Sequence, residues 1–169
     1  MKIFIMRHGP AEDQADSGVD SDRALTASGR ERVRAVAKLL HDIGEAPLQI
    51  VTSPLVRAVQ TAEIVAIASR LNEREGTVVV RRELSAGSGG GEALVTSLEG
   101  RAAKRVMLVG HEPDLSELVT QLAPGSGPPS FDKAMVVGLS VGPPGERARL
   151  RFVLDPRTLR LAPDERDRD

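Results

Sequence analysis

The first nine residues limit most strongly how this chain can fold. The segment Lys2–Met6 carries four consecutive apolar side chains and is followed at once by Arg7, His8 and Gly9. An apolar run of this length is typical of a short strand that is buried on both faces of a parallel sheet. In open α/β sheets, ligands bind beyond the carboxyl ends of the strands. We therefore predict a central strand over residues 2–6 that delivers an arginine and a histidine to a crevice.

Up to about residue 122, the chain alternates short apolar strands with amphipathic helices. Further strands are predicted over residues 49–52, 77–81 and 105–109, where aliphatic residues dominate. Apolar residues at helical spacing predict four helices, which begin after Thr26, at Pro54 with Ser53 as N-cap, at Glu92 and near Pro113. Strands and helices that alternate in this way predict a three-layer α/β/α sandwich around a mainly parallel central sheet.

The pattern changes in the last part of the chain. Two strands are predicted over residues 134–141 and 147–154, joined by a hairpin at the Gly-Pro-Pro-Gly of residues 142–145. Apolar residues and arginines alternate in the second strand, so we expect it to be an antiparallel strand toward the edge of the sheet. We expect residues 1–162 to form a single domain and the charged residues 163–169 to form a frayed tail.

Composition narrows the classes of function. The net charge is only -1, so bulk attraction to nucleic acid or to a membrane surface is not expected, and any anion site must be local. The chain has no cysteine, which excludes disulfides, thiolate catalysis and cysteine-ligated metals. No apolar run approaches the roughly 20 residues that a membrane span requires. We therefore expect a cytoplasmic protein.

Two later segments place further basic side chains at junctions between strands and helices. Arg57 lies in the segment Ser53–Ala62, and His111 lies in the segment Val109–Leu115. Backbone amides and the helix dipole favour anions at such junctions. Taken alone, Arg57 fits a solvated helix arginine, and His8 fits a histidine that caps a core strand. Together with Arg7, however, these residues form a set of two arginines and two histidines that suits a phosphoryl group.

With these motifs, the chain resembles the histidine phosphatase superfamily, which is also called phosphoglycerate mutase-like. The resemblance covers residues 1 to about 122, and the Gly-His-Glu-Pro-Asp-Leu-Ser run is most similar to the compact SixA-type phosphohistidine phosphatases. It implies a phosphoglycerate mutase-like fold in which His8 attacks phosphorus and becomes phosphohistidine. It also implies that Arg7, Arg57 and His111 hold the phosphoryl oxygens, with no metal and no cofactor.

A general acid is harder to identify. The resemblance places the usual acid in the loop after the third strand, where Glu83 is the first carboxylate. A surface glutamate at a strand end explains this residue equally well. The glycine-rich run of residues 85–91 lacks the lysine of a P-loop, so we interpret it as a rim segment. We expect the third histidine, His41, to interact with the last carbonyls or the dipole at a helix end. We expect the acids of the loop over residues 10–23 to be solvated.

Three hypotheses for function follow. The first is a metal-independent phosphatase that removes the phosphoryl group from phosphohistidine on a protein. An imidazole leaving group is less basic than an alkoxide, so this reaction tolerates a poorly placed acid. The second is a phosphomonoesterase for a small phosphate ester, which a well-placed Glu83 would favour. The third is a phosphate-dependent binding module without turnover, which would not require a nucleophile such as His8. A mutase is least expected, because the chain has no long insertion to close the site.

Overall fold

The computed structural model describes residues 1–98, 104–143 and 146–162. The strands are β1 (Lys2–Arg7), β2 (Gln49–Thr52), β3 (Thr77–Val80), β4 (Arg105–Gly110), β5 (Val136–Ser140), β6 (Arg149–Leu154) and β7 (Leu161–Ala162). The α-helices are α1 (Ala27–Asp42), α2 (Val56–Ala68), α3 (Gly91–Leu98) and α4 (Asp114–Leu122). Three short 3₁₀ helices are η1 (Asp20–Asp22), η2 (Asn72–Arg74) and η3 (Arg82–Leu84).

The strands form one mixed sheet in the order β3-β2-β4-β1-β5-β6-β7. The first four strands of this order are parallel to one another, and β5, β6 and β7 add antiparallel pairs. β1 lies at the centre, between β4 and β5, and the side chains from Ile3 to Met6 are fully buried. The predicted central strand is therefore confirmed, as is the mainly parallel sheet with antiparallel strands on one side.

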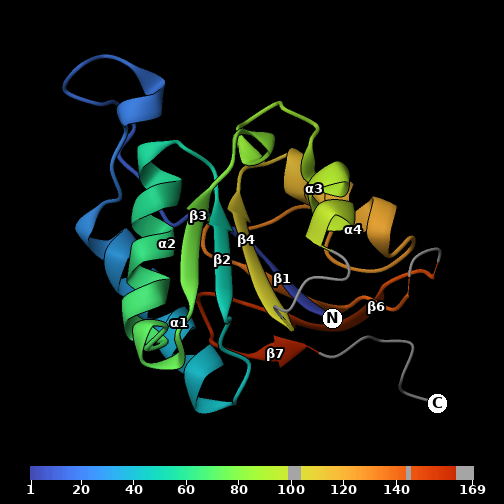
Figure 1. Cartoon of the computed structure of the whole chain (residues 1–169). Coiled ribbons are helices and arrows are strands. Elements are labelled where there is room, and N and C mark those ends of the chain that lie inside the picture. Colours follow the sequence, from blue (N-terminus) through green and yellow to red (C-terminus); the bar gives the residue numbers. More distant parts are fainter. Residues whose placement is uncertain (99–103, 144–145, 163–169) are drawn as a thin grey trace.

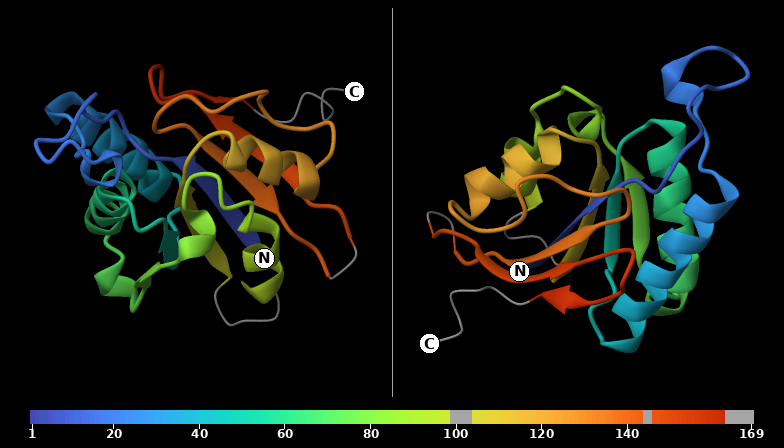
Figure 2. Two further views of the ribbon diagram at one scale, coloured as in Figure 1. Left: turned by 90° about the horizontal axis from the view of Figure 1, so that it is seen from above. Right: turned by 180° about the vertical axis from the view of Figure 1, so that it is seen from behind.

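Helices cover both faces of the sheet. Figure 1 shows α1 and α2 on one side of the strands and α3 and α4 on the other, and the two views of Figure 2 agree. One half of the core joins the sheet to α1 and α2, and the other half joins it to α3 and α4. The predicted apolar stripe of α1 is buried, and the Thr26 hydroxyl accepts a hydrogen bond from the Gly29 amide at 3.0 Å, as an N-cap does. The three-layer sandwich is confirmed.

The register of the strands brings three of them to the same edge. Met6 of β1 pairs with Val109 of β4, and Thr52 of β2 pairs with Val109 from the other side. The residues that follow these strands are therefore neighbours. The amide of His8 donates to the carbonyl of Gly110 at 3.1 Å, and the amide of Ser53 donates to the carbonyl of Val109 at 3.0 Å.

The structure corrects several predicted boundaries. α2 begins at Val56 with Leu55 as its N-cap, not at Pro54, and it ends at Ala68. The strand predicted over 147–154 is not the outermost one, because β7 pairs with the end of β6. β7 has only two residues, which is too short for an alternating apolar pattern to predict a strand. The hairpin tip at 144–145 and the tail at 163–169 lie outside the described residues. None of the helices in the described ranges has both the length and the apolar character of a membrane span.

Candidate active site

Two histidines face each other at the carboxyl edge of the sheet. His8 follows β1 and His111 follows β4, and these strands are adjacent in the sheet. The centroids of the two imidazole rings lie 5.1 Å apart. Both side chains are buried, with 6% of His8 and 3% of His111 exposed. A ligand that reaches these rings must therefore enter a recessed site.

His8 is held in one tautomer by its own neighbour. Its Nδ1 lies 2.7 Å from the carbonyl oxygen of Gly9. A carbonyl oxygen only accepts hydrogen bonds, so Nδ1 must carry the hydrogen and Nε2 must carry the free electron pair. Burial is the main cause that lowers the pKa of His8 to about 3, and the positive charges of Arg57 and Arg7 lower it further. The imidazole is therefore neutral at neutral pH, with Nε2 available as a nucleophile.

Gly9 has a steric role as well. A Cβ at this position would lie 2.6 Å from Cγ2 of Val33, which is too close for any other side chain. Its amide donates to the hydroxyl of Thr61 at 3.0 Å, and that hydroxyl donates to the carbonyl of Arg57 at 2.7 Å. The turn after β1 is thus tied to the first turns of α2, which fixes His8 relative to Arg57.

Arg57 is the second residue of α2, and 4% of it is exposed. Its Nη1 donates to the carbonyl of Asp20 at 2.9 Å, and its Nη2 donates to the Asp20 carboxylate at 3.0 Å. The same carboxylate lies 2.8 Å from Nε of Arg23. Among the described residues, Nε of Arg57 is buried without a hydrogen-bond partner. η1 therefore holds one side of the guanidinium and leaves the Nε donor free.

Arg7 shows a similar arrangement. Its Nη1 donates to the carbonyl of Phe131 at 2.6 Å, in the connection between α4 and β5. Its Nε is buried and has no partner in the described part of the chain. The guanidinium is thus fixed on one side by the backbone, while a second donor stays free.

His111 is oriented by Ser53. Its Nε2 lies 2.8 Å from the Ser53 hydroxyl, which also accepts a hydrogen bond from the Leu55 amide at 3.3 Å. Nδ1 of His111 is buried and unpartnered within the described residues. Burial is the main cause that lowers the pKa of His111 to about 4; the charge of Arg57 adds to this effect, while Asp114 and Asp20 oppose it. When Ser53 donates to Nε2, the hydrogen of His111 lies on Nδ1.

In the described part of the chain, the arrangement leaves three buried nitrogen atoms without partners around the His8 ring. These are Nε of Arg7, Nε of Arg57 and Nδ1 of His111. Buried donors without partners are costly, so the free Nε–H groups of Arg7 and Arg57 favour a bound anion, as does Nδ1 of His111 in the tautomer that carries its hydrogen there. Within residues 1–98, 104–143 and 146–162, no three His, Asp or Glu side chains form a group that could hold a metal ion.

Comparison with known proteins places this chain in a family. A family model described as histidine phosphatase superfamily (branch 1) matches residues 3–85. The solved structure of the protein histidine phosphatase SixA complexed with tungstate is 30% identical, with a TM-score of 0.84 over 95% of this chain and 100% of that chain. The chain belongs to the histidine phosphatase superfamily, branch 1.

Two curated relatives extend the match over nearly the whole chain. Phosphohistidine phosphatase SixA of Escherichia coli (strain K12) is 29% identical over 163 residues, which are 96% of this chain and 98% of the relative. An uncharacterized protein of Picosynechococcus sp. (strain ATCC 27264 / PCC 7002 / PR-6) is 37% identical over 145 residues, which are 84% of this chain and 86% of the relative. The family resemblance that the sequence motifs indicated is therefore confirmed.

Glu83, the candidate acid, is placed apart from the other four residues. It lies on η3, and its side chain is exposed. The carbonyl of its neighbour Leu84 would lie 3.6 Å from a Cβ at Gly110, so η3 borders the end of β4. Among the described residues, no hydrogen bond or ion pair joins the Glu83 carboxylate to Arg7, His8, Arg57 or His111. The structure thus puts Glu83 beside the end of β4, at the rim of the candidate site, and no hydrogen bond or ion pair of a described residue constrains its carboxylate.

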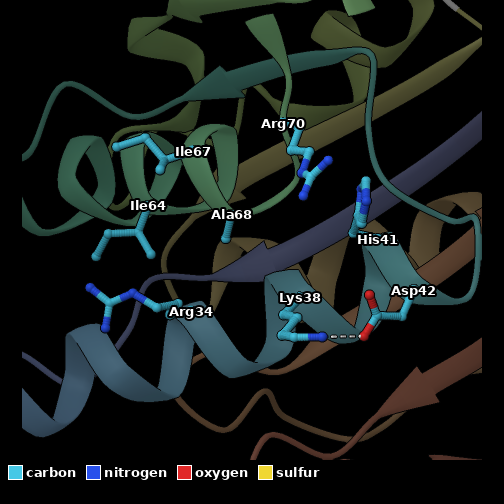
Figure 3. Close-up of a pocket in the computed structure, with 8 residues that line it drawn as sticks. All are labelled: Arg34, Lys38, His41, Asp42, Ile64, Ile67, Ala68 and Arg70. Atoms are coloured by element: carbon cyan, nitrogen blue, oxygen red, sulfur yellow. Dashed lines mark hydrogen bonds and ion pairs between the residues drawn. The ribbon is translucent and has the colours of Figure 1, made fainter. Parts of the chain in front are cut away.

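The third histidine lies away from the candidate site. His41 is in the last turn of α1, at the end of the helix that is farther from the Pro10 and Thr26 contact beside the site. It lines a groove of about 320 Å³ between α1 and α2, together with Lys38, Asp42 and Ile67 (Figure 3). Lys38 and Asp42 pair at 2.6 Å across one turn of α1. The position at a helix end agrees with the expectation from the sequence.

Sequence reasoning missed three residues that orient the site. The sequence pattern predicts Ser53 as a helix cap, but its hydroxyl contacts His111. It predicts Asp20 as part of a solvated loop, but this residue contacts Arg57. No motif in the sequence points to Phe131. Their partners are 58, 37 and 124 residues away in the chain. The one available signal was for Ser53, because a serine that follows a strand can face the same crevice as a neighbouring strand end.

Proposed function

We propose that this protein is a metal-independent phosphatase that uses His8 as its nucleophile and forms a phosphohistidine intermediate. The observation that carries the proposal is the neutral His8 ring, whose Nδ1–H is committed to Gly9 and whose Nε2 is therefore free to attack. Among the described residues, the unpartnered Nε donors of Arg7 and Arg57 supply binding groups for the phosphoryl oxygens, and Nδ1 of His111 adds a third when Ser53 donates to Nε2.

The reaction proceeds in two displacements. Nε2 of His8 attacks phosphorus, a P–N bond to His8 forms, and the bond from phosphorus to the leaving group breaks. Water then attacks the phosphohistidine, the P–N bond to His8 breaks, and inorganic phosphate leaves. His8 regains its free electron pair on Nε2, and its Nδ1–H bond to Gly9 keeps the ring oriented through both steps.

Charge balance supports the phosphoryl role. A phosphoryl dianion carries two negative charges, and the guanidiniums of Arg7 and Arg57 carry two positive charges. Asp20 offsets part of this charge, and Arg23 pairs with the same carboxylate. Arginines thus provide the electrostatic stabilisation that a metal ion provides in other phosphatases.

We favour phosphohistidine on a protein as the substrate, rather than a small phosphate ester. His8 and His111 are recessed, so the phosphoryl group must project into the site, as it does at the tip of an imidazole side chain. No contact orients Glu83 toward the site among the described residues, which suits a leaving group that needs little proton donation. The relative SixA of Escherichia coli is named a phosphohistidine phosphatase, and it matches almost the entire chain.

The test is an activity assay with two substrate classes. Purified protein is incubated with a protein phosphorylated on histidine and, separately, with a panel of sugar phosphates, each with and without EDTA. We expect phosphate release from the phosphohistidine protein, unaffected by EDTA and abolished by His8→Ala. Faster turnover of a sugar phosphate would favour the phosphomonoesterase. Binding of the phosphorylated protein without release would favour a binding module.

A further inference from the structure

The side chain of Glu112, the residue after His111, accepts two hydrogen bonds from other parts of the chain. Its Oε1 accepts from the amide of Phe131 at 3.2 Å, and its Oε2 accepts from the hydroxyl of Ser116 at 2.7 Å. Within the described ranges, no ion pair involves this carboxylate. The carboxylate is therefore committed to a backbone amide and a hydroxyl, and it links the start of α4 to the connection before β5.

Phe131 passes this link on to Arg7. Its ring is buried with 1% exposed, in the half of the core that also holds Leu115 and Leu118 of α4. Its carbonyl accepts the hydrogen bond from Nη1 of Arg7 at 2.6 Å. Phe131, whose side chain is fixed in the core, thus donates its amide to Glu112 and accepts from Arg7 at its carbonyl.

The other end of the link is also fixed. The Ser116 hydroxyl lies 2.7 Å from Oε2 of Glu112 and 2.9 Å from the carbonyl of Pro113, so it sits in the first turn of α4. α4 is anchored by Leu115 and Leu118, which are almost fully buried. The Glu112 carboxylate is therefore held by a residue of a well-packed helix.

We infer that Glu112 is a positioning residue for phosphoryl binding, and that it acts through Phe131 on the orientation of Arg7. This inference rests on the proposed phosphatase function. Arg7 uses one donor on Phe131 and keeps Nε free, so the place of the Phe131 carbonyl decides where Nε points. Loss of the Glu112 contact frees the Phe131 amide and widens the range of guanidinium orientations, which weakens binding of the substrate and of the transition state together.

Backbone hydrogen bonds that do not depend on Glu112 also hold the chain around Arg7. The amide of Arg7 donates to Met135 at 3.2 Å, and the amide of Ala134 lies within 3.2 Å of the carbonyls of Arg7 and His8. These backbone bonds do not involve Glu112. A variant at Glu112 should therefore stay folded and change how Arg7 presents its donors.

Three variants separate the positioning role from a general structural one. Glu112→Ala removes both hydrogen bonds. Glu112→Gln keeps an acceptor for the Phe131 amide and presents an NH₂ group to the Ser116 hydroxyl, which can turn its own hydrogen to Pro113. Glu117→Ala removes an exposed carboxylate from the same helix and serves as the matched control.

The probe is orthovanadate, whose dissociation constant is measured by calorimetry for the wild type and each variant. We expect Glu112→Ala to weaken binding by about 2- to 10-fold, the range of one net hydrogen bond, and Glu112→Gln and Glu117→Ala to change it by less. In an Arg7→Ala background, Glu112→Ala should have almost no further effect, because the residue through which it acts is gone. In steady-state kinetics, Glu112→Ala should mainly raise KM, and Glu112→Gln should have a KM close to that of the wild type.

The outcomes are distinct. Additive losses in the double variant, equal losses in Glu117→Ala, or an unchanged KM in Glu112→Ala would each overturn the positioning role. A wild-type protein that neither binds orthovanadate nor releases phosphate would contradict the proposed phosphatase, and it would do so before any Glu112 variant is compared.

Discussion

The rings of His8 and His111 lie 5.1 Å apart between centroids and are tilted by 51°. At this distance a protonated His111 disfavours a proton on His8, and the guanidiniums of Arg7 and Arg57 disfavour a proton on either ring. Burial, the largest cause, and these positive charges lower the pKa of His8 to about 3 and that of His111 to about 4. Without an anion, the charged and titratable groups of the site are thus two neutral imidazoles and two guanidiniums. An incoming dianion relieves the positive charge and makes a proton on His111 more favourable.

The first prediction is a loss of stability in mild acid. Both histidines have pKa values below the 6.5 of an unperturbed imidazole, so the unfolded chain takes up protons before the folded protein does. The free energy of unfolding should therefore fall as pH decreases from about 6.5 toward 5, by up to ~1.4 kcal/mol per pH unit for each imidazole. Urea unfolding followed by circular dichroism measures this slope, because the chain has no Trp or Tyr for fluorescence.

The variants His8→Asn and His111→Asn provide the control for this slope. Each should make the free energy of unfolding less dependent on pH between 6.5 and 5, and the double variant should be the least dependent. Carboxylates with lowered pKa values, such as Asp20 and Glu45, titrate below this window and do not confuse it. An unchanged slope in both single variants would show that the imidazoles are not held neutral by the fold.

The sequence predicted those parts of the fold that depend on local patterns. The apolar run before Arg7 and the helical spacing of Val33, Val36, Ala37 and Leu40 each reflect burial that repeats with the period of one element. The Thr26 cap is also local, because the hydroxyl accepts from an amide three residues later. Since parallel strands end at one edge, the same patterns placed His8 near His111.

The parts that the sequence could not predict depend on partners distant in the chain. Ser53 followed by Pro54 has the composition of a helix start, but its hydroxyl bonds to His111, and the helix begins only at Val56. Asp20 lies in an acidic loop whose composition indicates solvation, and only its contact with Arg57 distinguishes it from the other acids. Such pairings require the tertiary fold, because no sequence spacing relates the two residues.

A second prediction concerns Asp20. Partial burial raises its pKa, but the hydrogen bond and charge of Arg57, together with Arg23, lower it overall, so the carboxylate is ionised at neutral pH. Asp20→Asn keeps the backbone carbonyl and a side-chain oxygen for Arg57 but removes one negative charge beside the site. We expect phosphate and orthovanadate to bind about 2- to 5-fold more tightly, the scale of one exposed charge.

Salt dependence separates this charge effect from a change in shape. The gain in Asp20→Asn should shrink as sodium chloride rises toward 1 M, because the Debye length falls to about 3 Å. Calorimetric titration at low and high salt makes the comparison. Weaker anion binding in Asp20→Asn at both salt concentrations would mean that the carboxylate mainly orients Arg57, and the charge argument would be wrong.

A third prediction concerns Ser53. Ser53→Ala removes the hydroxyl that holds Nε2 of His111 at 2.8 Å and leaves the Leu55 amide without that acceptor. His111 then loses its fixed orientation, and we expect kcat/KM for the preferred substrate to fall by about 10-fold, which corresponds to ~1.4 kcal/mol. Imidazole ¹⁵N spectra should show a changed tautomer balance for His111 and an unchanged one for His8. Equal changes in both rings would indicate a general disturbance of the strand edge.

The last prediction separates substrate classes through Glu83, whose exposed carboxylate lies at the rim on η3. An imidazole leaving group departs with little proton donation, so Glu83→Gln should leave the rate of phosphohistidine cleavage nearly unchanged. An alkoxide leaving group needs an acid, so the same change should slow cleavage of a phosphate ester by about 10²- to 10⁴-fold if Glu83 supplies the proton. Single-turnover phosphate release from both substrates, by wild type, Glu83→Gln and the matched surface variant Glu92→Gln, makes the comparison. A loss of about 100-fold or more for Glu83→Gln on phosphohistidine, on that same scale, would show that P–N cleavage here requires this acid, because the proposed nucleophile His8 and both arginines are intact in that variant.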